Sequence, residues 1–444
     1  MPPPQPSRST ALTAAASIAS AIGLIGSLYY LDIPSLLTQR VQSRKVTKRG
    51  FDPTTKPSLA EFKLVCEQTT LKSTYPLAKT IAKNIPIYDC RDFDLTNTRK
   101  IDQLQDELYH NLTLGPGAYV LKHFFPDTSI IDAANEAYDT IIAAEKAANG
   151  AKGDHFAPGA ANDRIWNSFS KHALTDPQNF VSYFSNPWFK VSCDSYLGPG
   201  YRITTQVNIV RPGGKAQMPH RDYHLGFQTD ADVVAWPKSM HALSGHLTLQ
   251  GAAAHTDMPL DSGPTRLLPY SQNFAEGFRA YRTQEFIDYF HDNYVSLPLE
   301  KGDAVFFSPA LFHAAGENVT KDFSRSANLI QVSSAFGKTM ESIDPLPLVE
   351  KTYDVLQAKY KREGMSAEVD AFIRAVADGY PFPTNLDCRP PAPGRMAPET
   401  EQDILRRVLS EGGGRETVMA ELTDMREGSD ANGRIDRQTQ VFGT

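Results

Sequence analysis

A series of short strand-like segments between residues 201 and 336, each closed by glycine or proline, most constrains the fold. In the segment YRITTQVNIV (residues 201–210) polar and apolar side chains alternate, which places Ile203, Val207 and Ile209 on one face. The alternation returns in residues 245–251, and residues 303–316 and 324–337 add two more strand-like segments. Many short strands with such punctuation are typical of a sandwich, barrel or jelly roll, so we expect a mainly β fold with flanking helices.

Helical patterns lie on both sides of this region. Residues 129–148 carry good helix formers at helical spacing, and residues 180–196 suggest another helix that Gly198 and Pro199 end. The chain after Asp344 returns to helical patterning. The apolar side chains of residues 180–196 are expected in the core.

Shifts in composition divide the 444 residues into three parts. Residues 1–50 are an N-terminal hydrophobic and basic segment, and residues 51–387 are one large domain. Residues 388–444 begin with the linker CRPPAPGRMAPET and continue as a polar C-terminal extension with one or two expected surface helices. A chain of this length can bury a substantial core.

The N-terminal segment allows several interpretations. Residues 11–31 carry no charge and are about as long as a bilayer-spanning helix, and basic residues follow from Arg40 to Arg49. Under the positive-inside tendency the rest of the chain would stay on the cytoplasmic side of a membrane anchor. A cleaved secretory or mitochondrial targeting segment, or a packed or disordered helix, are the alternatives.

Composition also bears on the partners. The formal net charge is −6, and no basic stripe is interleaved with aromatic residues. Nucleic acid is therefore not an expected partner. The sequons at Asn111 and Asn318 are glycan acceptors only in a secretory compartment.

Two His-x-Asp pairs are candidates for a metal site. The first is His220 and Asp222 in QMPHRDYHLGF, and the second is His255 and Asp257 in AHTDM. On a strand, residues two apart point the same way, so His220 and Asp222 would share a face. Alone, such a pair is weak evidence for a metal site, because it can equally be an ordinary surface pair.

Two later residues complete a recognisable set with the first pair. His313 would add a second imidazole, and two imidazoles with one carboxylate form the facial triad of non-heme iron oxygenases. Arg325 opens the next strand, and its planar guanidinium suits the far carboxylate of a cosubstrate. Gln206 and Asn208 share a strand face that leads to the first pair, where they would contact the cosubstrate or serve the sheet.

Three stretches carry a resemblance to a known family. YRITTQVNIVRPGGKAQMPHRDYH, DSGPTRLLPYSQ and KGDAVFFSPALFHAAGENVTKDFSRSANLIQVS resemble, in order and spacing, the phytanoyl-CoA dioxygenase family of Fe(II)/2-oxoglutarate-dependent oxygenases. The resemblance covers about residues 115–340 and implies a double-stranded β-helix, a cupin-like jelly roll, as the core of an oxygenase domain over residues 51–387. It departs from the family pattern at Arg221, at Ala315 and in PYSQ. The positions it implies are His220, Asp222 and His313 for iron and Arg325 for 2-oxoglutarate.

The resemblance implies a reaction as well. With Fe(II), 2-oxoglutarate and O2, the enzyme would hydroxylate an unactivated C–H bond of a small molecule and release succinate and CO2. The alternatives are a desaturase, epoxidase or cyclising oxidase at the same site, a cupin-type metal protein without 2-oxoglutarate, or a scaffold with a vestigial site. The pair His255 and Asp257 has no iron role in this reading. Among the neighbours, Trp166 could form part of a substrate pocket, but packing in the core is the favoured interpretation. His224 could support a ligand or contact substrate, but neither role is the favoured interpretation.

Overall fold

The computed structural model of the chain describes residues 46–149, 162–380, 382 and 385–429. The chain divides into two compact units, Met1–Gly50 and Phe51–Thr444, and the second unit is described below. Residues 11–31 lie outside the described residues, so the predicted membrane association and cellular location stay predictions. In the part of the chain that the structure describes, no helix is long and apolar enough to cross a membrane.

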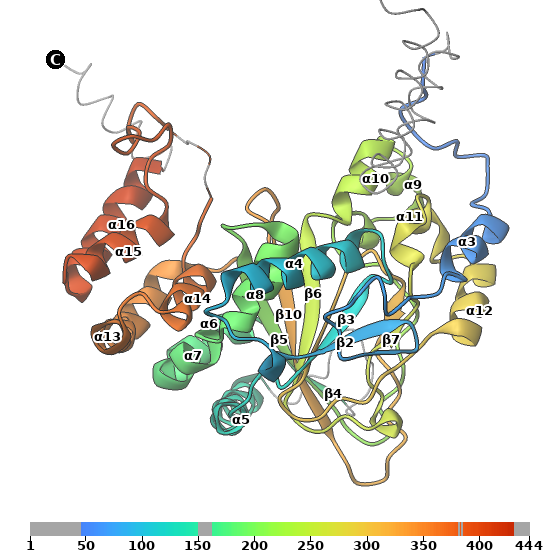
Figure 1. The fold of residues 1–444 in the computed structure, drawn as a ribbon, viewed down its shortest axis with the longest axis horizontal. Coiled ribbons are helices and arrows are strands. Elements are labelled where there is room, and N and C mark those ends of the chain that lie inside the picture. Colours follow the sequence, from blue (N-terminus) through green and yellow to red (C-terminus); the bar gives the residue numbers. More distant parts are fainter. Residues whose placement is uncertain (1–45, 150–161, 381, 383–384, 430–444) are drawn as a thin grey trace, which may run out of the picture. The chain divides into compact units, whose positions relative to one another are not determined.

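Eight strands form one large mixed sheet in the middle of the second unit (Figure 1). Their order is β1-β2-β3-β8-β6-β10-β5-β4, in which β2 and β3 run parallel and the other neighbours antiparallel. The bounds are β1 Thr80–Ala82, β2 Ile85–Asp89, β3 Ala118–Lys122, β4 Asn162–Ile165, β5 Arg202–Val210, β6 Thr248–Ala254, β8 Ala304–Phe307 and β10 Arg325–Ser333. A second sheet pairs β7 (Arg266–Leu267) with β9 (His313–Ala314).

The two faces of β5, β6 and β10 differ in chemistry. One face adds apolar side chains to the main core, namely Ile203, Val207, Leu249, Ile330 and Val332. The other face lines a cavity with polar side chains, namely Gln206, Asn208, Gln250, Arg325 and Gln331. The alternation predicted for residues 201–210 is therefore present, but almost all of β5 is buried on both faces.

Helices cover the apolar face of the sheet, where α6, α8 and α14 contact β5 and β6 (Figure 1). The helices of this layer are α4 Thr98–Thr113, α5 Ser129–Asn149, α6 Ser168–Thr175, α7 Pro177–Phe184, α8 Pro187–Leu197, α13 Pro345–Glu363 and α14 Ala367–Val376. The remaining shorter helices before α13 are α3 Leu59–Cys66, α9 Asp230–Val233, α10 Lys238–Ser244, α11 Gly277–Ala280 and α12 Gln284–Asn293. More of the described residues lie in helices than in strands, so the expectation of a mainly β chain does not hold.

One predicted helix is in fact two. The helix expected over residues 180–196 is broken between α7 and α8 at Asn186, which precedes Pro187. A residue before proline is disfavoured in the helical region, so α7 ends there. Asn186 then caps α8, since its side-chain oxygen accepts the backbone N–H of Trp188 at 3.0 Å. The helix predicted over residues 129–148 is confirmed as α5.

Two helices of the C-terminal extension belong to the folded unit. They are α15 (Glu401–Ser410), which a Thr400–Asp403 capping box begins, and α16 (Arg415–Ser429). Leu405 and Leu422 from these helices are buried in the main apolar core. The predicted division of the chain at residue 387 stays a prediction, but this part of the extension packs against α13 and α14.

Both sequons place their asparagine inside the protein. Asn111 and Asn318 are each 0% exposed. The side-chain nitrogen of Asn318 donates to the carbonyls of Val210 and Phe323, and that of Asn111 donates to the carbonyl of Ala118. The folded chain therefore leaves no room for a glycan at either position.

Candidate active site

The predicted metal ligands come from a loop and from β9. The segment around His220, expected as a strand, is a loop in which His220 forms an isolated bridge with His313. Each of these residues donates its backbone N–H to the carbonyl of the other, at 2.9 and 3.1 Å. The backbone N–H of Asp222 donates to the carbonyl of Pro309 at 3.0 Å. These bonds fasten the loop to the segment that carries His313.

The three side chains converge on one point. Their candidate ligand atoms all lie within 4.8 Å of one another. The Nε2 atom of His220 lies 3.7 Å from Oδ1 of Asp222, and that of His313 lies 3.4 Å from Oδ2. Two nitrogens and one oxygen thus face a common centre, with the other side open to the cavity.

Hydrogen bonds fix which ring nitrogen of each histidine is free. The Nδ1 atom of His220 lies 2.8 Å from the carbonyl oxygen of Met218, and that of His313 lies 2.8 Å from the carbonyl oxygen of Leu311. A carbonyl only accepts, so each Nδ1 must carry the hydrogen and each Nε2 keeps its lone pair for a metal.

Burial and neighbouring groups shift the pKa values of His220 and Asp222. Burial lowers the pKa of His220 below its usual range. Burial alone would raise the pKa of Asp222. The neighbouring His220 and His313 and the amide of Gln250 lower it by more than burial raises it, so the net pKa is below the usual range. Asp222 therefore stands as a carboxylate beside a neutral His220 at neutral pH, as metal binding requires.

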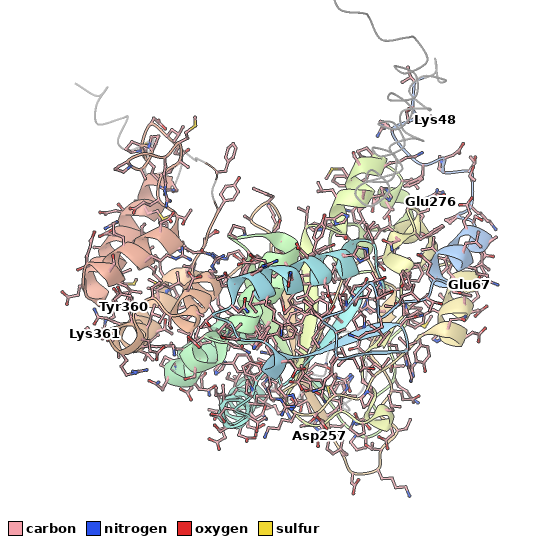
Figure 2. The ribbon with its side chains drawn as sticks, in the orientation of Figure 1. Lys48, Glu67, Asp257, Glu276, Tyr360 and Lys361 are labelled. Atoms are coloured by element: carbon pink, nitrogen blue, oxygen red, sulfur yellow. The ribbon has the colours of Figure 1, made fainter. Side chains whose placement is uncertain are left out.

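The second His-x-Asp pair does not form such a centre. His255 is 1% exposed, with its Nδ1 atom 2.6 Å from Oδ1 of Asn135 and its Nε2 atom 2.9 Å from the hydroxyl of Tyr183. Asp257 is exposed near the edge of the sheet (Figure 2), where its carboxylate accepts the backbone N–H of Lys301 at 2.9 Å. Both ring nitrogens of His255 are taken, so it has no lone pair to offer a metal.

A cavity of about 720 Å³ opens beside the three converging side chains. Arg325 lies in its wall and is 4% exposed. Its Nη1 atom lies 3.4 Å from Oδ1 of Asn208, and in the described part of the chain its buried Nε has no hydrogen-bond partner. Burial and the charge of Arg164 lower the pKa of Arg325 to about 10, so the guanidinium stays charged at neutral pH. Within the described residues no carboxylate pairs with it, which leaves a buried cation ready for an anion.

The other two predicted cosubstrate contacts also lie in the cavity wall, but their partners differ. Asn208 touches Arg325, as described above. The side-chain oxygen of Gln206 accepts from Nη1 of Arg164 at 2.9 Å. The structure therefore places Asn208 beside the predicted cosubstrate arginine and Gln206 beside a second arginine.

Sequence reasoning did not settle which further residues line the cavity. Trp166, expected in the core, lines the cavity together with Gln250 and Gln331. His224 instead borders a smaller neighbouring cavity of about 320 Å³. Strand parity was the available signal, because on β10 every second residue from Arg325 faces the cavity.

The chain is similar to known dioxygenases. The family profile described as Phytanoyl-CoA dioxygenase (PhyH) matches residues 115–327. Dioxygenase olcK of Penicillium canescens is 24% identical over 294 residues, which are 62% of this chain and 86% of olcK. Dioxygenase cdmD of Talaromyces verruculosus is 28% identical over 179 residues, which are 39% of this chain and 54% of cdmD, so the chain spans about half the length of that relative.

One solved structure illustrates the more distant matches. The non-heme alpha ketoglutarate dependent epimerase SnoN from nogalamycin biosynthesis aligns with a TM-score of 0.38 and 16% identity, over 54% of this chain and 85% of SnoN. The family profile and the related dioxygenases confirm the resemblance predicted from the sequence. They also confirm the prediction that the chain is an Fe(II)- and 2-oxoglutarate-dependent dioxygenase.

Proposed function

We propose that this phytanoyl-CoA dioxygenase domain binds Fe(II) through His220, Asp222 and His313, holds 2-oxoglutarate with Arg325, and hydroxylates a C–H bond of a small molecule. The observation that carries the proposal is the convergence of three ligand atoms within 4.8 Å beside a cavity whose wall holds a buried guanidinium, which pairs with no carboxylate of the described residues. Neither the three converging side chains nor the buried guanidinium would by itself stabilise the fold, because burying charged or polar groups costs free energy unless a ligand or counter-ion compensates them.

The donor set fits iron. Two imidazole nitrogens and one carboxylate oxygen on one side of a centre are the ligands of non-heme Fe(II) oxygenases, and the opposite side stays open for cosubstrate and O2. The carbonyl contacts of His220 and His313 keep both rings in the tautomer that offers Nε2. These two residues and Asp222 would hold the metal in a fixed orientation toward the cavity.

Arg325 fits the far carboxylate of 2-oxoglutarate. Its planar fork can donate two parallel hydrogen bonds to a carboxylate, and burial makes each of them stronger than in water. Asn208 lies beside it and orients the guanidinium through its side-chain oxygen. The anion would also remove the cost of a buried unpaired charge.

Iron and 2-oxoglutarate supply, together with O2, the oxidation of an unactivated C–H bond, with succinate and CO2 as coproducts. The protein binds the substrate, aims the C–H bond at the metal side of the cavity and excludes water. A cavity of about 720 Å³ leaves room for a substrate well beyond the cosubstrate. We expect this substrate to be partly apolar, because the wall includes Trp166, Phe227, Tyr281, Ile287 and Met340.

We further propose that the two sheets form a jelly roll. The pair β7–β9 is extended on one side by the bridge His220–His313 and on the other by the bridge Leu267–Val295. This smaller sheet would face the cavity side of the large sheet, with the ligands carried on the smaller one. The proposal would be refuted by an experimental structure in which the two sheets do not enclose the cavity.

An anaerobic titration tests the proposed function. Purified protein is titrated with Fe(II) and then 2-oxoglutarate, and the visible iron-to-cosubstrate charge-transfer band is recorded. The wild type and His255→Ala should show the band, whereas His220→Ala should not. A wild type that binds iron without a band would favour a cupin-type protein that does not use 2-oxoglutarate, and a wild type that binds no iron would favour a scaffold.

Product analysis then separates the outcomes at one site. Hydroxylation adds one oxygen atom to the substrate, whereas desaturation or cyclisation removes two hydrogens. Succinate release provides the screen for the substrate. A scaffold with a vestigial site would release no succinate under any condition, even uncoupled from substrate oxidation. Arg325→Ala should abolish succinate release while iron binding persists.

A further inference from the structure

Gln250 contacts the carboxylate that we assign to the metal. Its side-chain nitrogen lies 2.5 Å from Oδ2 of Asp222. Gln250 belongs to β6, and the register pairs it directly with Gln331 of β10. Both side chains face the cavity. The large sheet thus supplies a hydrogen bond to a residue on the loop across the cavity.

The contact continues through two more side chains. The same nitrogen of Gln250 lies 3.2 Å from the side-chain oxygen of Gln331. That oxygen also accepts from the hydroxyl of Tyr223, at 2.6 Å. Tyr223 directly follows Asp222. The series of hydrogen bonds therefore begins at Asp222, passes through one residue of β6 and one of β10, and ends at the residue after Asp222.

Donor and acceptor counting fixes the direction of this chain. The amide group of Gln250 has two hydrogens, which go to Asp222 and Gln331. Its side-chain oxygen is buried and has no hydrogen-bond partner among the described residues. Rotating the amide by half a turn would set that oxygen against a carboxylate and another amide oxygen, so the observed orientation is strongly preferred. Gln250 therefore acts only as a donor to Asp222.

The backbone at Tyr223 is strained. Its φ of 60° and ψ of 155° lie in a region that glycine occupies almost alone, and the φ of His224 is also positive, at 39°. Such strain persists only where surrounding contacts hold it. Tyr223 is 4% exposed, and its hydroxyl bond to Gln331 is one such contact.

We propose that Tyr223, Gln331 and Gln250 form a positioning relay that keeps Oδ2 of Asp222 occupied and presents Oδ1 to the metal. The inference rests on the proposed function and deepens it. A carboxylate that is free on both oxygens can bind through one or both, and the second mode takes a position that cosubstrate or O2 needs. The relay holds the ligand in the first mode, and it makes Gln250 and Gln331 positioning residues.

Cobalt(II) binding tests the relay without turnover. Apoprotein is titrated anaerobically with Co(II) against a chromophoric chelator, and the visible d–d bands report the coordination number. Gln250→Leu should bind Co(II) about tenfold or more weakly, with changed band intensities, because lost support of a ligand commonly costs about 10–100-fold. Thr248→Val is the matched control. Thr248 lies on the same strand and is 0% exposed, but its hydroxyl has no hydrogen-bond partner within the described ranges and it does not line the cavity.

A double-mutant cycle identifies the relay as one unit. Tyr223→Phe removes one hydroxyl and should weaken Co(II) binding less than Gln250→Leu does. In the Gln250→Leu background it should cause no further loss, because the link to Asp222 is already broken. Should Gln250→Leu fail to fold, Tyr223→Phe alone decides, since unchanged affinity and bands would overturn the relay.

The outcomes separate this inference from the proposed function. A wild type that binds metal and 2-oxoglutarate, with Gln250→Leu indistinguishable from it and from Thr248→Val, overturns the relay alone. A wild type that binds no metal overturns the proposed function and the relay together. Additive losses in the double mutant also overturn the relay, because Tyr223 and Gln250 would then act independently.

Discussion

Replacing Arg325 by methionine should stabilise the apoprotein while it abolishes 2-oxoglutarate binding. Arg325 is 4% exposed and pairs with no carboxylate of the described residues. Burial lowers its pKa to about 10, and a depression of this size corresponds to about 3 kcal/mol against the charged form. Methionine fills part of the same space without a charge, so the free energy of unfolding should rise by about 1–3 kcal/mol.

The same change removes the proposed anion site. Hydrogen bonds to charged groups contribute about 1.5–3 kcal/mol each, and Arg325 offers two parallel ones to a carboxylate. Their loss should weaken 2-oxoglutarate binding by about a hundredfold or more. Urea unfolding of the apoprotein measures the first effect. The rise of the melting temperature with added 2-oxoglutarate, in the presence of Co(II), measures the second.

Arg374→Met is the matched control with the opposite sign. Arg374 is also largely buried, but it donates to Asp194 at 3.1 Å and to Asp370 at 2.9 Å. Its removal leaves Asp194 with only Lys190 and Asp370 with only Arg406 as a basic partner. This variant should therefore lose stability and keep 2-oxoglutarate binding. The reasoning is refuted if Arg325→Met is destabilised as much as Arg374→Met, or if it still binds the cosubstrate like the wild type.

Three further predictions concern stability. Burial lowers the pKa of His172 to about 4 and that of His255 to about 3, whereas both return to about 6.5 on unfolding, so the unfolded state binds more protons in acid. The unfolding free energy from urea titrations should therefore be level above pH 7 and fall below pH 6.5 by up to about 1.4 kcal/mol per pH unit for each histidine, and a flat profile down to pH 4.5 would contradict this. Leu405→Ala should cost about 2–5 kcal/mol in the same assay, because the side chain is 0% exposed; a loss below about 0.5 kcal/mol would mean that α15 does not stabilise the unit. A Cβ added at Gly277 would collide with the guanidinium of Arg221, so Gly277→Ala should lower the melting temperature by several degrees, and an unchanged value would show that Arg221 can move aside.

The strands of this fold were more predictable than its class. Alternation in residues 201–210 correctly places Ile203 and Val207 on one face. Alternation normally separates a buried face from a solvated one, but here the polar face is buried as well, because Gln206 and Asn208 line a cavity. The helices that cover the apolar face contain more residues than the strands. The alternation within a strand does not predict how many helical residues will pack on the sheet. The break at Pro187 was readable from the sequence, since the residue before a proline disfavours helix.

Side-chain partners explain why the two His-x-Asp pairs have different fates. Locally the pairs look alike, and only the resemblance separated them in the sequence. In the structure, Nδ1 of His220 meets a carbonyl two residues away, which forces a hydrogen onto Nδ1 and frees Nε2. The two nitrogens of His255 instead meet Asn135 and Tyr183, which lie 120 and 72 residues away along the chain. A histidine can bind a metal only through a nitrogen that no other group occupies, and for His255 that condition is decided by residues from distant helices. The short-range contact of His220 is the part that a sequence can encode locally, whereas the loss of the second site depends on the folded arrangement.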